Sequence, residues 1–367
     1  MSTTAAFMPG LTLGRMFFHE IGRSIIESLV PRDAYAAAFT GSGSDVLGYD
    51  SVTSTDHHWG PRFQVFLAED REAEKTGLLD RELQRRLPDV FHGFTAKFSD
   101  PDHFDEGTMP PVPPGDGLVH HLIEITTVRA FFLRHLGMDI LGPVGPRDWL
   151  TFPEQRLLEL TSGEVFHDPS GELSRCREKL AGYPRDVWLY RMACQWHRLS
   201  RQEAFVGRCN EAGDSLGMKL VAGRIARDAM KLCFLMERTY APYEKWLGTA
   251  FGKLRCAAEA KRRLTGALDG GTFGAIEDNL VALYQMLGAM HNSLGLTGPL
   301  DIAPRRFFSR PYLVIGAERF TNALLRSIEC EELRSISIRI GAIDQYSDST
   351  DFIENVEMYR KSLGLYR

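Results

Sequence analysis

The chain has 367 residues, of which 44% are hydrophobic and 25% are charged, and its formal net charge is -5. This composition is typical of a folded protein, and it excludes a collagen-like, low-complexity or intrinsically disordered chain. The mildly acidic balance argues against a long nucleic acid as a partner, because coating a nucleic acid needs a strongly basic face. At roughly 150 residues per domain, the length predicts two domains.

No stretch of the sequence approaches the roughly 18 consecutive apolar residues of a membrane-spanning helix, so no membrane partner is expected. The N-terminus does not have the pattern of a signal peptide, because Arg15, His19 and Glu20 interrupt its apolar residues. The six cysteines form no Cys-x-x-Cys pair, which disfavours a zinc ribbon and a redox motif of that kind. We therefore expect a cytoplasmic protein with reduced thiols.

The first part of the chain alternates between predicted helices and predicted strands. Phe17, Ile21 and Ile25 recur at every fourth position within residues 11–30, which predicts an amphipathic helix. Short apolar or alternating runs predict strands, and a charged stretch with spaced leucines predicts a surface helix. The strands are expected at 34–40, 62–68, 91–98 and 118–127, and further helices at 71–87 and 131–136. The segment 99–117 is rich in proline and aspartate, so it is predicted to be a loop.

Glycines and prolines in residues 142–146 mark the predicted domain boundary. Beyond this point the sequence is rich in leucine and has helical periodicity. The expected helices are 153–160, 185–212, 216–240, 242–262 and 273–293. We therefore predict an α+β fold: an α/β domain in residues 1–145, an all-helical domain in 146–300, and an extension in 301–367 that packs on the helical domain.

The most informative segment is residues 43–62, GSDVLGYDSVTSTDHHWGPR, which lies between two predicted strands. Gly43 allows a sharp turn and a close approach of the backbone to a ligand, and Ser44 offers phosphate oxygens a hydroxyl and a main-chain N–H. Asp56 and His58 are predicted at the start of the second strand, where residues i and i+2 share a face. Such a pair can hold a divalent cation against a triphosphate.

This order of a Gly-Ser turn, a spacer and an acidic strand resembles the signature of the nucleotidyltransferase superfamily, which includes kanamycin and lincosamide nucleotidyltransferases and DNA polymerase beta. The resemblance implies a nucleotidyltransferase-like domain with a mixed sheet, in which Gly43 and Ser44 contact the nucleotide phosphates and Asp56 is a metal ligand. The superfamily takes a third carboxylate from a neighbouring strand, and Glu124 is our candidate. His58 departs from the pattern, because the superfamily has Asp or Glu there, and imidazole suits Mg²⁺ less well than a carboxylate does.

A second resemblance extends over nearly the whole chain. It is carried by the phrases GSDVLGYDSVTSTDHHWGPR, PRDVWLYRMACQW, ERTYAPYEKWLGTAF and GAIDQYSDSTD. These phrases resemble an uncharacterised family, domain of unknown function 4037, in which the domain is attached to a nucleotidyltransferase-like domain. The likeness strengthens the expected fold and implies no substrate.

The predicted helix at 216–240 carries Arg224, Arg227 and Lys231 on one face. This face is a candidate site for the β- and γ-phosphates of a nucleoside triphosphate, and a solvated helical face is the alternative. Lys245 follows among aromatic residues. The resemblance to the helical domains of antibiotic nucleotidyltransferases favours Lys231 and Lys245 as further nucleotide contacts.

A second histidine pair precedes Glu124. His120 and Glu124 share a face of the predicted strand, and with Asp56 and His58 they would form a His-rich transition-metal site. In the alternative, one histidine of each pair faces solvent and the other lies in a hydrogen-bonded core.

The sequence therefore predicts an enzyme that transfers a nucleotidyl group, first of all an adenylyl group, from ATP or another nucleoside triphosphate to a small-molecule or protein acceptor. The predicted cofactor is Mg²⁺ or Mn²⁺, with Zn²⁺ as the alternative that His58 raises, and the predicted ligands are Asp56, His58 and Glu124. Two other functions stay open: a catalytically degenerate nucleotide-binding or regulatory module, and a His-rich metal-dependent hydrolase.

Overall fold

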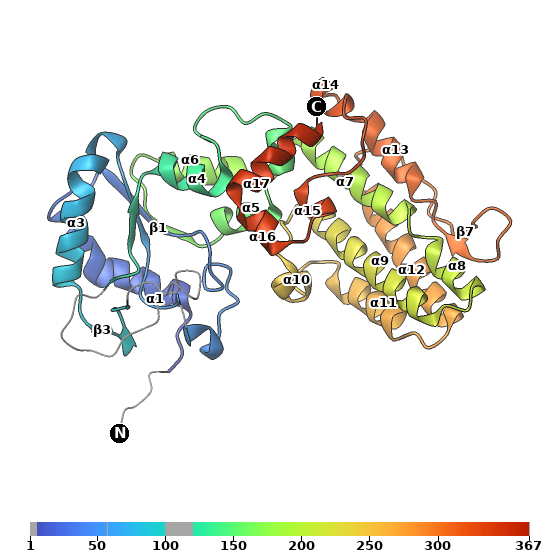
Figure 1. The fold of residues 1–367 in the computed structure, drawn as a ribbon, viewed down its shortest axis with the longest axis horizontal. Coiled ribbons are helices and arrows are strands. Elements are labelled where there is room, and N and C mark those ends of the chain that lie inside the picture. Colours follow the sequence, from blue (N-terminus) through green and yellow to red (C-terminus); the bar gives the residue numbers. More distant parts are fainter. Residues whose placement is uncertain (1–5, 57, 100–119, 367) are drawn as a thin grey trace. The chain divides into compact units, whose positions relative to one another are not determined.

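The protein is α+β, as the sequence predicts, with a mixed four-stranded sheet in its first half and helices through most of the remainder (Figure 1). A computed structural model describes residues 6–56, 58–99 and 120–366. The predicted loop at 99–117 lies outside these residues, apart from Ser99. Among the described residues, no helix is both long and apolar enough to cross a membrane.

The chain folds as two compact units. Unit 1 contains Met1–Pro143 and Arg156–Ala181, and unit 2 contains Val144–Gln155 and Gly182–Arg367. The division therefore differs from the boundary predicted after residue 145, because Arg156–Ala181 returns to the first unit. The reason is that this segment holds a strand that completes the sheet of unit 1.

The sheet of unit 1 has the strand order β5-β2-β1-β6. β1 (Tyr35–Phe39) pairs antiparallel with β2 (Gln64–Leu67) and with β6 (Glu164–His167), and β2 pairs parallel with β5 (Glu124–Thr126). β1 and β2 are buried along their whole length, and apart from Gln64 their residues are apolar or aromatic. The sequence predicts β1, β2 and β5. It misses β6, a short and half-buried strand at the sheet edge.

The predicted N-terminal helix is confirmed, although one of its turns is irregular. α1 (Gly10–Phe17) continues through a π-helical turn (Phe18–Gly22) into α2 (Arg23–Glu27). Its apolar side chains, among them Phe17, share one core with β1, β2 and the leucines of α3 (Glu72–Arg86). Burial of this face against the sheet is what stabilises the helix pair.

Two short elements differ from their predicted bounds. The strand predicted at 91–98 is a hairpin of β3 (Val90–Phe91) and β4 (Phe94–Thr95), whose turn residues His92 and Gly93 both have positive φ. The helix predicted at 131–136 is α4 (Val128–Leu136), and it begins earlier because the hydroxyl of the preceding residue, Thr127, caps it.

Unit 2 is built from helices that pack on one another. α9 lies beside α7, α8, α11 and α12 (Figure 1). The predicted run 185–212 is two helices, and so is 242–262. Their bounds are α7 (Arg185–Ser200), α8 (Phe205–Glu211), α9 (Ser215–Met236), α10 (Glu244–Phe251), α11 (Ala257–Asp269) and α12 (Phe273–Ser293).

The remaining elements are short, and α5 is shared by the two units. α5 begins in unit 2 and ends in unit 1, α6 belongs to unit 1, and the others belong to unit 2. Their bounds are α5 (Glu154–Thr161), α6 (Glu172–Leu180), β7 (Arg305–Arg306), β8 (Leu313–Val314), α13 (Glu318–Arg326), α14 (Glu331–Arg334), α15 (Ile343–Tyr346), α16 (Thr350–Glu354) and α17 (Val356–Lys361). Residues 341–351 are thus partly helical.

A substitution at Gly163 tests how closely the chain at the start of β6 approaches β1. Its φ is +76°, and a Cβ there would lie 1.9 Å from the carbonyl oxygen of Phe39. We expect Gly163→Ala to lower the free energy of unfolding by about 2–4 kcal/mol, because the strand must shift as well as adopt a strained φ. The control is Gly295→Ala, which has a φ of +64° in open space and should cost about 1 kcal/mol. Equal losses in urea unfolding would contradict the close approach.

Candidate functional site

The prediction that Asp56 and His58 lie at the start of the second strand is wrong. Asp56 is the last residue of a 3-10 helix (Val52–Asp56), and β2 begins only at Gln64. His58 lies in an exposed bend with a φ of 46°, a value that an extended strand does not allow. The two residues therefore do not present one strand face. The Asp56 side chain is outside what the structure describes, so its role as a metal ligand stays a prediction.

Glu124 lies on β5, as predicted, and its register partner on the parallel strand β2 is Gln64. The Glu124 carboxylate pairs with the guanidinium of Arg134 in α4. The amide side chain of Gln64 bonds both main-chain groups of Thr40, at 3.0 and 2.9 Å. The strand beside Glu124 thus carries a structural amide at this position.

The side chains that can be placed do not form the predicted metal centre. Among the residues that the structure describes, no three His, Cys, Asp or Glu side chains come close enough to hold an ion. His121 lies in a buried position, where its Nδ1 accepts a hydrogen bond from the Ile123 N–H, and burial lowers its pKa. Because the Asp56 side chain lies outside the described residues, the three predicted ligands are not tested as a set, and we derive no step through a metal that they would hold.

Polar groups do come together around the turn that follows β1. Gly41 and Gly43 have φ values of 85° and 141°. At residue 43, a Cβ would lie 2.2 Å from the Arg62 guanidinium and 2.3 Å from the Asp45 carboxylate. Only glycine therefore satisfies both the backbone angle and the available space at this position.

An ion pair lies beneath this turn. Arg62 donates from Nη2 to Asp45 Oδ1 at 2.6 Å and from Nε to Oδ2 at 3.1 Å. The same Nη2 donates to the main-chain oxygen of Ser42 at 3.1 Å. Because the Asp45 carboxylate is 2% exposed and the pair is bidentate, it fixes the path of the chain through residues 42–45.

The main-chain N–H groups of Ser42, Gly43 and Ser44 donate no hydrogen bond to any acceptor among the described residues. The Ser44 hydroxyl likewise has no partner there. Ser42 is exposed, and the other two are half-buried. Successive N–H groups in a turn with positive φ form a concavity that binds anions such as phosphate. This is the chemistry that the sequence predicted for Gly43 and Ser44.

The end of α5 is fastened to the same turn. Arg156 Nη1 donates to Ser42 Oγ at 2.9 Å and to Glu159 Oε2 at 2.8 Å, and the Ser42 hydroxyl donates to Glu159 Oε2 at 3.2 Å. The Gly41 N–H donates to the Glu159 main-chain oxygen at 3.1 Å. The sequence analysis did not single out Arg156 or Glu159, because they lie more than 110 residues beyond the turn.

His135 of α4 also borders the turn. A Cβ on Gly41 would lie 3.8 Å from its Nε2. Burial, together with the positive charges of Arg134 and Arg156, lowers the pKa of His135 to about 3. The imidazole is therefore neutral at physiological pH and adds no positive charge to the site.

The three cations predicted on α9 have different surroundings. Arg224 is exposed. Arg227 pairs with the Glu244 carboxylate of α10. Lys231 is buried, and its Nζ donates to the Asp344 main-chain oxygen at 2.9 Å, while burial lowers its pKa. Internal partners thus account for Arg227 and Lys231, and the binding of phosphate by these cations stays a prediction.

Arg227 and Lys231 line a small pocket of unit 2 together with the acids Glu154, Glu244, Asp344 and Asp348. The pocket has about 20 Å³ of space for the centre of a water-sized sphere, which is room for about one water molecule. Small-molecule sites are typically about 300–1,000 Å³. In this conformation the pocket is therefore too closed for a nucleotide.

A buried ion network lies behind this pocket. Arg191 of α7, whose side chain is 1% exposed, donates to Glu154 at 2.8 Å and lies 3.6 Å from the Asp344 carboxylate. Asp344 Oδ2 accepts the Glu154 N–H at 3.0 Å. The Arg191 guanidinium also lies over the ring of Tyr183, 4.4 Å from its centre. The network joins α5, α7 and α15 within unit 2, so Asp344 is a structural residue.

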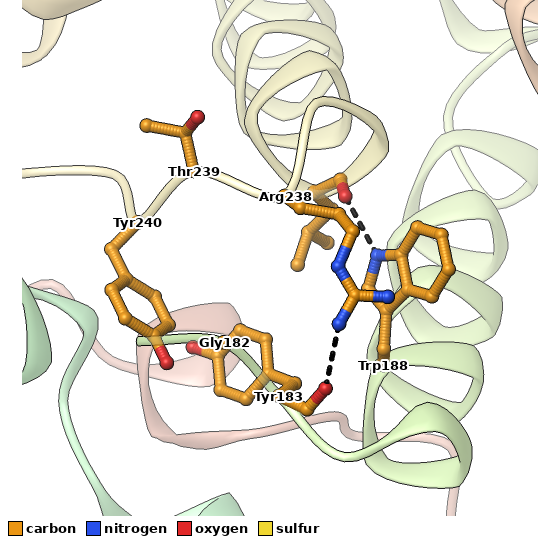
Figure 2. Close-up of a pocket in the computed structure, with 7 residues that line it drawn as sticks. Gly182, Tyr183, Trp188, Arg238, Thr239 and Tyr240 are labelled. Atoms are coloured by element: carbon orange, nitrogen blue, oxygen red, sulfur yellow. Dashed lines mark hydrogen bonds between the residues drawn. The ribbon is translucent and has the colours of Figure 1, made fainter. Parts of the chain in front are cut away.

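Figure 2 shows a second pocket of unit 2, around Arg238. Arg238 Nη2 donates to the Tyr183 main-chain oxygen at 3.0 Å, and its guanidinium lies 4.3 Å from the centre of the Trp188 ring. Tyr183 and Tyr240 meet edge to face. The pocket has about 10 Å³ of space, so this cluster of aromatic and cationic side chains is packed.

Two further charged residues of unit 2 have different surroundings. Glu203 accepts the N–H groups of Ile315, Gly316 and Ala317 at 3.0–3.1 Å, so it holds the chain before α13. Lys245 is exposed beside the Trp246 ring, 5.3 Å from its centre. The nucleotide-binding role expected of Lys245 stays a prediction.

Comparison with known proteins supports a family for part of the chain. Residues 149–247 match the model of a family described as Domain of unknown function (DUF4037), which confirms that resemblance over about a quarter of the chain. No curated protein matches. A crystal structure of a nucleotidyltransferase-like protein from Exiguobacterium sibiricum 255-15 aligns at 11% identity and a TM-score of 0.33, over 79% of this chain and 82% of that one. This TM-score is too low for the similarity to assign a fold or an activity.

His135 predicts a pH dependence of stability. Its pKa of about 3 in the folded state lies below its ordinary value of 6.5, so between these values the unfolded state binds more protons. The contribution of His135 to the free energy of unfolding is complete above about pH 6.5. Below that pH it declines by up to about 1.4 kcal/mol per pH unit. We expect the difference in stability between wild type and His135→Gln, measured by urea unfolding, to shrink from pH 7 to pH 5. A constant difference would contradict the buried neutral imidazole.

A substitution of Arg191 measures how much the buried ion network contributes to the free energy of unfolding. We expect Arg191→Met, which keeps the side-chain length, to lower the free energy of unfolding by about 3–5 kcal/mol, because buried Glu154 and Asp344 lose their cation. Arg255→Met is the control, because its side chain is 87% exposed in its pair with Glu237 and should contribute less than about 1 kcal/mol. Similar unfolding midpoints for the two variants would show that the network is not a major source of stability.

Proposed function

We propose that the chain is a nucleotidyltransferase that transfers an adenylyl group, or another nucleotidyl group, from a nucleoside triphosphate to a small-molecule or protein acceptor. The observation that carries the proposal is the turn Gly41–Ser44, where three successive N–H groups face no acceptor among the described residues and lie beside two arginines. The resemblance of residues 43–62 to the nucleotidyltransferase signature supports the same assignment.

The charges around the turn favour a triphosphate that already carries a divalent cation. Arg62 is paired with Asp45, and Arg156 with Glu159, so these four side chains sum to zero. A neutral cradle of N–H groups binds a partly neutralised anion at a smaller electrostatic cost than a bare triphosphate. The substrate in the proposal is therefore MgATP or MnATP, with the cation arriving as part of it. Asp56, His58 and Glu124 remain its proposed ligands.

The reaction needs little covalent chemistry from the protein. An acceptor hydroxyl attacks the α-phosphorus, the bond from that phosphorus to the bridging oxygen breaks, and pyrophosphate leaves. The hydroxyl proton passes to water. In the proposal, the N–H groups of Ser42 to Ser44 and the Arg156 guanidinium bind the β- and γ-phosphate oxygens, where negative charge accumulates as pyrophosphate departs.

Arg156 provides the most direct test among the side chains. We expect wild-type protein to bind MgATP in calorimetry, and Arg156→Gln to bind it roughly 10–100-fold more weakly, because one charge-assisted hydrogen bond to phosphate is lost. Arg175→Gln is the matched control, since Arg175 is an exposed arginine of the same unit that bonds a main-chain oxygen. Absence of binding by the wild type with Mg²⁺ and with Mn²⁺ would exclude the proposal.

Turnover is measured separately from binding. Wild-type protein is incubated with ATP labelled at the α-phosphate, Mg²⁺ or Mn²⁺, and a panel of hydroxyl and protein acceptors, while pyrophosphate release is followed. We expect acceptor-dependent release and transfer of the label to the acceptor. Label transfer without pyrophosphate, or release of free AMP alone, would point to another reaction.

A nucleotide-binding regulatory module is the second candidate, and one observation favours it. Residue 58 is a histidine, where the superfamily resemblance implies Asp or Glu. In this case the wild type binds MgATP without turnover. His58→Asp then separates an inactive site from an unsuitable acceptor panel, because a gain of Mg²⁺-dependent turnover would identify a degenerate wild-type site.

A further inference from the structure

The most exposed large apolar side chain among the described residues is Phe308, in the loop between β7 and β8 of unit 2 (Figure 1). Phe308 is 85% exposed, and its φ is 54°. The loop turns tightly here, because the Arg310 N–H donates to the Phe307 main-chain oxygen at 3.0 Å. A positive φ in a turn favours glycine. Neither the backbone nor burial in the described part of unit 2 therefore accounts for a phenylalanine at this position, whereas an external binding partner would.

The hairpin that carries Phe308 is fixed at its base. Phe307 stacks on the buried Tyr312, with ring centres 6.0 Å apart, and meets the Phe308 ring edge to face at 4.8 Å. The Leu313 N–H donates to Glu277 Oε1 of α12 at 2.8 Å. Because the base is packed, the Phe308 ring is held in place, and less conformational entropy is lost when a partner binds it.

Arginines surround this ring, and we call residues 305–310 the tip. Arg305 pairs with Asp301 at 2.8 Å, and Arg310 pairs with Glu211. Arg306 is exposed and has no side-chain partner among the described residues. The tip therefore offers an aromatic ring and one unpaired positive charge. Aromatic residues and arginine are enriched at protein–protein interfaces.

Unit 1 has an open hollow of about 570 Å³ beside β6. β6 is the outermost strand in the order β5-β2-β1-β6, so one edge of it has no neighbouring strand among the described residues. Edges of this kind can accept another chain. The hollow is large enough to admit an aromatic side chain. It is lined by Phe166, Pro169, Asp33, Asp168, Arg32 and His167.

The hollow combines an aromatic floor with an unpaired acid. The half-buried Phe166 stacks on Phe18, with ring centres 5.5 Å apart, so its ring is fixed. Asp168 Oδ2 accepts the Ser174 N–H at 2.8 Å, whereas Asp33 is exposed and has no side-chain partner among the described residues. With histidine counted as neutral, the formal charge of the lining residues is negative, because the acids outnumber the arginine.

We propose that the tip of one copy of this chain docks in the hollow of a second copy, with Phe308 against Phe166 and Arg306 facing Asp33. The two surfaces match in chemistry, since each presents an aromatic ring and an unpaired charge, and the charges are opposite. A polyanion is disfavoured as the occupant of the tip, because the chain has a net charge of -5. The contact joins two different surfaces, so it is heterologous.

The association is weak and depends on concentration. A buried aromatic side chain contributes about 150–250 Å², whereas a stable interface buries about 1,600 Å² in total. We expect a dissociation constant of roughly 10–500 µM. The proposal does not require that the protein bind or transfer a nucleotide, so it and the proposed function fail independently.

Sedimentation velocity of the full chain, from about 5 to about 500 µM, tests the docking. We expect the weight-average sedimentation coefficient of the wild type to rise with concentration, and Phe308→Ala to weaken self-association about 10–100-fold. Leu216→Ala is the matched control, because Leu216 is 68% exposed in the same unit and should leave self-association unchanged. A wild type that stays monomeric at about 500 µM would overturn the proposal, whether or not the tip binds a labelled oligonucleotide or an anionic vesicle.

Mixing two variants identifies the surfaces. Phe308→Ala loses the tip but keeps the hollow, and Asp33→Arg alters the hollow but keeps the tip. We expect these variants to bind each other more tightly than either binds itself, which a contact between two tips cannot produce. Circular dichroism confirms that both are folded. If the mixture associates no more tightly than the separate variants, the tip does not dock in the hollow.

A charge exchange tests the pairing of Arg306 with Asp33. We expect Arg306→Glu and Asp33→Arg each to weaken self-association about tenfold, and their combination in one chain to restore most of it. Arg326→Glu is the matched control, because Arg326 is an exposed arginine of the same unit and should have little effect. Additive losses in the double variant would contradict the pairing.

Discussion

The bidentate pair between Arg62 and Asp45 is the interaction on which the candidate site depends. Its guanidinium and carboxylate fill the space where a side chain at residue 43 would lie, so that residue must be glycine. The hydrogen bond from Arg62 to the Ser42 main-chain oxygen then sets the direction of the turn. With that carbonyl engaged beneath the turn, the N–H groups of residues 42–44 remain for a ligand.

In unit 2, buried charged side chains bind one another and the main chain, and so mainly stabilise the fold. Arg191 lies in a cluster with Glu154 and Asp344, and the nearby Lys231 donates to the main chain. Buried charges of this kind must be paired, because removing an ion from water is costly. On the cationic face that the sequence predicts as a phosphate site, Arg227 is paired with Glu244 and Lys231 is buried against the main chain, so the turn in unit 1 is the better candidate for phosphate binding.

Local patterns predict β1, β2 and the N-terminal helix, because their periodicity follows directly from the side chains that they bury. The order Asp-x-His leads to the prediction that residues 56 and 58 begin the second strand. They do not, because His58 has a positive φ and β2 begins at Gln64. The local pattern indicates Ser44 and not Ser42 as a phosphate contact. The side chain of Ser42 is bound by Arg156 and Glu159. No local pattern reports a contact with residues so far along the chain, so the turn could be predicted from the sequence but its neighbours could not.

The central claim is that the turn Gly41–Ser44 binds the phosphates of a nucleoside triphosphate. A crystal structure of the chain with Mg²⁺ and a non-hydrolysable ATP analogue tests it most directly. The account predicts β- or γ-phosphate oxygens within hydrogen-bonding distance of the N–H groups of Ser42, Gly43 and Ser44, with the Arg156 guanidinium beside them. Nucleotide bound elsewhere, with these N–H groups in contact only with solvent, would contradict it.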